Sequence, residues 1–125
     1  WLPEKNIDVF FVTLNKADKD YSPTTMYNDY SINESLFHWQ SQSTTAETSS
    51  TGQRYIHHKE RGSKVLLFVR EFKADRVTGG AEAYTYLGTA RYVKHEGSRP
   101  MNITWQLDRP IPAKFLKKTN KLVVG

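Results

Sequence analysis

Five apolar segments separated by turn signals predict a small, mainly β domain of the α+β class: a closed or half-closed β-barrel with one or two short helices. The 125 residues are enough for one hydrophobic core and too few for two. Residues 1–125 are therefore expected to form a single domain. No strand pattern alternates with a long helical one, as a parallel βαβ sheet would require.

The first half of the chain predicts two strands with a short helix between them. Residues 6–15 (NIDVFFVTLN) are rich in β-branched and aromatic residues and apolar on both faces, which is typical of a central, buried strand. Residues 26–30 follow two possible capping residues, Ser22 and Thr24, and are expected to form a short helix. The second strand is predicted over residues 35–42 (SLFHWQSQ).

The two faces of the strand predicted over residues 35–42 differ in character. Phe37 and Trp39 share one face. The opposite face is mostly polar and carries Leu36, His38, Gln40 and Gln42. Residues 43–52 (STTAETSSTG) are small, polar and low in complexity, which predicts a mobile loop.

The second half of the chain predicts three more strands and a helix. Residues 64–72 (KVLLFVREF) form a strongly apolar strand, and residues 94–100 form a turn. Between them, the strand over residues 83–93 is expected to place five residues on one face: Tyr84, Tyr86, Gly88, Ala90 and Tyr92.

The most regular strand pattern covers residues 101–108. Its apolar residues alternate with polar ones and are expected to face the core: Met101, Ile103, Trp105 and Leu107. After two prolines, residues 113–120 predict a short helix with Phe115 and Leu116 as its apolar anchors.

Composition excludes several classes of site. The chain has no cysteine, so it contains neither disulfides nor thiolate metal sites. No pair of its four histidines has the spacing of a helical metal site, and we expect no metal and no cofactor. No apolar run approaches the roughly 20 residues that span a bilayer, and no signal peptide is recognisable. We therefore expect a cytoplasmic domain without membrane contact.

The sequence favours binding over catalysis. No serine or threonine lies in a nucleophile elbow, and Gly79-Gly80 is not followed by the lysine and serine of a phosphate-binding loop. The formal net charge of +5 favours polyanions, with cations gathered in residues 54–73 and 114–121. A solvated surface explains this modest charge equally well.

Two stretches interleave aromatic, amide and basic side chains. They cover residues 27–42, with gaps, and residues 51–59. Aromatic rings stack on bases, amides pair with base edges, and Arg or Lys binds phosphate. In the alternative interpretation Phe37 belongs to the core, and Gln40 and Gln42 are ordinary exposed strand residues.

A resemblance covers Leu2 to Gly125. The runs FVTLNK, FHWQSQ, TGQRYIHH, VLLFVREF, YLGTARYVKHEGSRPMNI and PIPAK resemble the C-terminal domain of SauUSI-like type IV restriction enzymes. In these proteins the domain follows a phospholipase-D-type nuclease and a superfamily-2 helicase. The resemblance implies an SRA-like barrel that reads double-stranded DNA carrying 5-methylcytosine or 5-hydroxymethylcytosine, joined to nuclease and helicase domains in one bacterial defence polypeptide.

Such a reader can flip the modified base into a pocket, stack it between rings and pair its Watson–Crick edge. The candidate rings and edge-reading residues of the base pocket are Tyr27, Asp29, Tyr30, Trp39, Gln40, Gln42 and Tyr55. The candidates for contact with the DNA backbone are Arg54, His57, Lys59 and Arg99.

Two other functions remain open from the sequence. The domain can be a non-specific DNA-grip domain of a helicase, or a docking module that contacts protein and no DNA.

Overall fold

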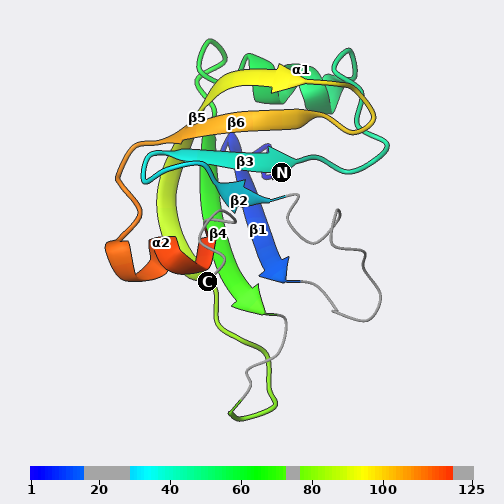
Figure 1. Cartoon of the computed structure of the whole chain (residues 1–125). Coiled ribbons are helices and arrows are strands. Elements are labelled where there is room, and N and C mark those ends of the chain that lie inside the picture. The colour runs from blue at the N-terminus through cyan, green and yellow to red at the C-terminus, as the bar shows by residue number, and fades with distance from the viewer. Residues whose placement is uncertain (16–28, 73–76, 120–125) are drawn as a thin grey trace.

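One curled sheet of six strands makes up most of the domain, and two short helices complete it (Figure 1). The computed structural model describes residues 1–15, 29–72 and 77–119. Within these ranges the strands are β1 (Ile7–Asn15), β2 (Tyr30–Ser31), β3 (Leu36–Gln40), β4 (Lys64–Phe72), β5 (Thr85–Glu96) and β6 (Asn102–Leu107). The helices are α1 (Ser50–Ile56) and α2 (Ala113–Thr119). The predicted mainly β, barrel-like α+β class is confirmed.

The strands lie in the order β1-β4-β5-β6-β3-β2. The β1–β4 pair is parallel, and the other four pairs are antiparallel. Figure 1 shows β5 curving from the part of the sheet formed by β1 and β4 into the part formed by β6 and β3. The register of β5 shifts once in its pairing with β4 and once in its pairing with β6, and such bulges increase strand twist. The long, bent β5 therefore curls the sheet into a half-barrel.

The hydrophobic core lies on the inner face of this half-barrel. The strand pattern predicted over residues 101–108 is confirmed, because its four apolar residues are all at most 3% exposed: Met101, Ile103, Trp105 and Leu107. Phe37 is fully buried, as the core interpretation predicted. The helix predicted at residues 113–120 is also confirmed as α2, and its anchors Phe115 and Leu116 pack against the core.

The prediction that residues 6–15 form a central strand is wrong. In the described part of the sheet, β1 is an edge strand that pairs with β4 alone. Its inner side chains are buried, but Phe11 is 62% exposed and stacks on Phe68 of β4. Phe11 therefore belongs to an exposed aromatic cluster on the outer face, and not to a second core.

The single face predicted for residues 83–93 is also wrong. The register skips a residue, since Leu67 pairs with Gly88 while Phe68 pairs with Tyr86. This bulge turns Leu87 into the core and leaves Tyr86 45% exposed. The strand also continues to Glu96, through the first residues of the turn predicted at residues 94–100.

The predicted loop at residues 43–52 ends earlier than expected, because α1 begins at Ser50. Ser49 caps the helix, and its Oγ accepts a hydrogen bond from the Gly52 N–H at 3.0 Å. A Cβ on Gly52 would lie 2.2 Å from the carbonyl oxygen of Ala46. Position 52 therefore requires glycine, because the helix and the preceding loop touch here. Of the helix predicted at residues 26–30, Tyr30 instead begins β2, and residues 26–28 lie outside the described ranges.

Candidate nucleic-acid interface

A cavity of about 490 Å³ opens where the edge strand β1, the residues after β3 and helix α1 meet. Its size lies within the range of small-molecule sites. The lining residues come from four segments: Trp1, Asp8, Val9, Phe10, Phe11, Trp39, Gln42, Thr44, Thr45, Ser49, Thr51, Arg54 and Tyr55. We call this space the β1–α1 cavity. A larger depression of about 760 Å³ beside α2 is lined by no aromatic side chain.

Three aromatic rings form a tightly packed group beside the β1–α1 cavity. Phe10 and Trp39 are stacked, with centroids 4.2 Å apart and an interplanar angle of 11°. Tyr55 meets both rings edge-on, with centroids 5.4 Å from Trp39 and 5.5 Å from Phe10. Trp39 also packs against the buried core. Because each ring constrains the other two, the aromatic wall is preorganised.

A buried ion pair supplies the polar part of the cavity. Asp8 lies on β1 and is 3% exposed, and its carboxylate accepts two hydrogen bonds from Arg54 of α1, at 2.8 and 2.9 Å. The Trp1 ring covers the guanidinium at 4.1 Å. The Asp8 hydrogen bond raises the pKa of Arg54, against the opposing effect of burial. The pair uses two of the five N–H donors of the guanidinium.

Tyr55 has a raised pKa, chiefly because burial disfavours its phenolate and also because Asp8 is near, with Arg54 opposing. The folded protein therefore holds the phenol proton above the ordinary pKa of about 10, where the unfolded chain releases it. We expect the free energy of unfolding to fall as the pH rises above about 10. In Tyr55→Phe the decline between about pH 8 and about pH 11, measured by urea unfolding, should be smaller. An identical decline in both proteins would contradict this assignment.

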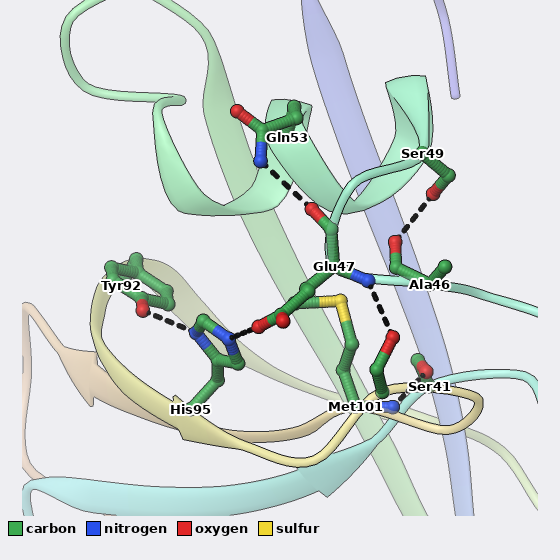
Figure 2. Close-up of polar contacts among 9 residues, drawn as sticks. Ser41, Ala46, Glu47, Ser49, Gln53, Tyr92, His95 and Met101 are labelled. Atoms are coloured by element: carbon green, nitrogen blue, oxygen red, sulfur yellow. Dashed lines mark hydrogen bonds and ion pairs between the residues drawn. The ribbon is translucent and has the colours of Figure 1, made fainter.

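A chain of hydrogen-bonded side chains links β5 to the segment between β3 and α1 (Figure 2). The Tyr92 hydroxyl lies 2.7 Å from His95 Nδ1, and His95 Nε2 lies 2.7 Å from a Glu47 carboxylate oxygen. Burial, and next the Glu47 charge, raise the pKa of Tyr92. Glu47 also accepts a hydrogen bond at its carbonyl from Gln53 of α1. This chain of side chains thus ties β5 to the segment that carries Gln42, Thr44 and Thr45.

The structure brings together four of the eleven predicted site residues in the β1–α1 cavity. They are Trp39, Gln42, Arg54 and Tyr55. Three come from the predicted base pocket, and Arg54 comes from the predicted backbone contacts. The pairing of Arg54 with Asp8 offsets the charge on which a phosphate contact would depend.

Three other predicted pocket residues lie away from this cavity. Tyr30 stacks on His38 at 4.7 Å and lines a separate cavity of about 250 Å³. Asp29 accepts a hydrogen bond from the Gln40 backbone N–H, and the Gln40 side chain donates to Asn102. Tyr27 lies outside the described residues.

The remaining backbone candidates lie on the surface in two places. His57 and Lys59 directly follow α1; His57 is 3.3 Å from Glu60, and Lys59 is exposed. Arg99 is exposed in the connection between β5 and β6, where its backbone N–H donates to the Thr45 carbonyl. That bond joins the Arg99 backbone to Thr45, which lines the β1–α1 cavity.

Sequence reasoning missed three central residues of the cavity: Trp1, Asp8 and Phe10. Asp8 carried a usable signal, because an acid inside an apolar strand must find a partner when that strand is buried. Its partner Arg54 is 46 residues away, so spacing alone did not connect them.

Comparison with protein families places the chain in one family. Residues 2–118 match a family described as a domain of unknown function, DUF3427, and the chain belongs to that family. A comparison with curated proteins finds no match.

The described residues offer neither a membrane-spanning helix nor a metal-binding cluster. No helix in residues 1–15, 29–72 and 77–119 is long and apolar enough to cross a membrane. In the same ranges no three His, Asp or Glu side chains are grouped to hold a metal ion.

Proposed function

We propose that this domain binds double-stranded DNA containing 5-methylcytosine or 5-hydroxymethylcytosine and acts as the specificity domain of a SauUSI-like type IV restriction enzyme. In this proposal it is a binding domain without catalytic activity, and nuclease and helicase domains of the same polypeptide cut and move along the DNA. The observation that supports it most directly is the convergence of Trp39, Tyr55, Arg54 and Gln42 on one cavity.

The chemistry of the β1–α1 cavity suits a flipped base. A base removed from the stack loses stacking and pairing worth a few kcal/mol, which the pocket must return. Trp39 and Tyr55 offer aromatic surface, and stacking on such rings is worth about 1–3 kcal/mol per base. The Asp8 carboxylate can accept from the exocyclic amine of cytosine, and Arg54 can donate to a ring acceptor.

A modified cytosine differs from an unmodified one by a small group at C5. Val9 and Phe10 line the cavity and provide apolar contact for a methyl group. Burying one methyl group is worth about 0.8 kcal/mol, which corresponds to roughly fourfold in affinity. Discrimination in this pocket is therefore expected to be modest per site.

The test is a binding comparison with a short duplex carrying one 5-methylcytosine, one 5-hydroxymethylcytosine or none. Fluorescence anisotropy should give at least about fourfold tighter binding for a modified duplex. The variant Gln42→Ala removes an exposed cavity residue and should reduce that ratio while leaving the melting temperature unchanged. Gln106→Ala, an exposed glutamine on β6 outside the cavity lining, is the matched control and should keep the ratio.

The other two functions give different results in the same assay. Equal affinity for all three duplexes, with log affinity falling by about 0.9 per neutralised phosphate as log salt rises, would favour a non-specific DNA grip. No binding to any duplex at low salt would favour a protein-docking module.

A further inference from the structure

The outer face of the sheet carries an aromatic row that runs across three neighbouring strands. Phe11 of β1 pairs with Phe68 of β4, and Phe68 pairs with Tyr86 of β5. The ring centroids are 5.3 Å apart for Phe11 and Phe68 and 4.8 Å apart for Phe68 and Tyr86. A fourth ring, Tyr84, meets Phe11 at 5.1 Å. We call these four residues the outer aromatic row.

The rings of this row are open to solvent. Phe11 is 62% exposed, Tyr86 45% and Tyr84 37%. Burying such rings is strongly favourable, and a monomeric protein rarely leaves several of them together on one face without a binding role. The row is separate from the β1–α1 cavity except at Phe11, which lies at the edge strand and touches both.

The charge around the row is positive. Arg70 of β4 lies over the Tyr84 ring at 4.4 Å and donates to the Thr13 hydroxyl and the Glu82 carbonyl. Both acceptors are uncharged, so the guanidinium keeps its full charge at this face. The Glu82 carboxylate accepts hydrogen bonds from the backbone N–H groups of Glu71 and Phe72 and remains a negative charge in this arrangement.

Two more cations flank the row. Lys64 is exposed at the start of β4 and, by strand alternation, lies on the face of Phe68 and Arg70. At the other side, Arg109 and Tyr86 line a common cavity of about 430 Å³. The Asp108 carboxylate, which follows β6, is paired with Arg91.

From this arrangement we infer that the outer aromatic row is a second nucleic-acid surface, which binds single-stranded DNA or RNA by stacking bases on its rings. Exposed aromatic rings on a sheet, flanked by arginine and lysine, are the arrangement with which proteins bind single strands. An apolar protein partner would fit the rings but would leave the Arg70 and Lys64 charges without counterparts. The inference stands without the cavity, because Phe68, Tyr84 and Tyr86 do not line it.

The test uses a fluorescent oligothymidylate on the order of 10 nucleotides long, within the range of known single-strand sites. Tyr86→Ala should weaken its binding by at least about fivefold, the lower end of the loss expected for one stacking ring. Tyr86→Phe keeps the ring and should bind as the wild type does. Tyr86→Leu keeps apolar surface without a ring and should bind as weakly as Tyr86→Ala.

Val93→Ala is the matched control, since Val93 lies on the same strand, is 46% exposed and is outside the row. Its affinity should equal that of the wild type. Lys64→Gln gives an independent readout, because losing one phosphate contact should reduce the salt slope by about 0.7.

Three outcomes would overturn the inference. The first is that the wild type does not bind the oligonucleotide, and the second is that Tyr86→Leu binds as well as Tyr86→Phe. The third is that Tyr86→Ala changes the oligomeric state in sedimentation, which would identify the row as a protein contact. Failure of the base-reading proposal would appear separately, as a wild-type protein without preference for modified duplexes. If that preference exists, Tyr86→Ala should leave it unchanged.

Discussion

Arg54→Met should destabilise the domain by roughly 3–5 kcal/mol, which is the loss expected when one partner of a buried ion pair is removed. The methionine keeps most of the length of the arginine stem but leaves the Asp8 carboxylate, only 4% exposed, without its counter-charge. For a domain of this size the melting temperature should fall by at least about 10 °C. Urea unfolding and a thermal melt at neutral pH measure this loss.

The double variant separates the charge from the packing. Asp8→Asn alone should cost less, roughly 2 kcal/mol, because the Arg54 side chain is 16% exposed and can turn toward water. Adding Asp8→Asn to Arg54→Met removes the unpaired charge and should recover at least half of the stability that Arg54→Met loses. Strictly additive losses in the double variant would show that the two side chains do not act as a pair.

The same double variant is useful for the function. It keeps the aromatic wall of Phe10, Trp39 and Tyr55 while replacing both charged groups of the cavity. If base-edge hydrogen bonds contribute to recognition, the folded double variant should lose most of its preference for modified duplexes. Binding through phosphates elsewhere on the surface should persist.

The fold was predictable for strands that bury only one of their two faces. The alternation over residues 101–108 maps directly onto β6, because that strand lies inside the sheet with one face on the core. Apolar residues on both faces misled the prediction for β1, because Phe11 serves an exposed cluster. The face of β5 was not predictable, because the bulge at Leu87 shifts the alternation by one residue without leaving a distinct sequence signal.

The candidate site was predictable in its aromatic and amide part only. Trp39, Gln42 and Tyr55 stood out by residue type, and the curled sheet brings them to one cavity. Gln40 follows Trp39 directly, and strand alternation turns it to the other face, toward Asn102. Asp8 and Trp1 reach the cavity only through the parallel pairing of β1 with β4 and its contact with α1, which local patterns do not reveal.

Trp39→Ala should reduce both folding stability and DNA binding, because Trp39 packs on the core and also lines the cavity. Replacing a fully buried tryptophan by alanine costs about 3–5 kcal/mol of folding stability. Because Trp39 is half-buried, Trp39→Ala should cost roughly 2–3 kcal/mol. Loss of stacking should weaken binding to a modified duplex by a further 1–3 kcal/mol or so, measured well below the melting temperature.

Two variants separate these effects. Trp39→Phe keeps a ring against Phe10 and should melt close to the wild type, while its smaller surface should still lower the ratio of modified to unmodified affinity. Gln40→Ala lies on the opposite face of β3, bonded to Asn102, and should leave that ratio unchanged with little effect on stability. A folded Trp39→Ala protein that keeps its full preference for modified DNA would exclude the β1–α1 cavity as the base pocket, because the Trp39 ring would then not stack on the modified base.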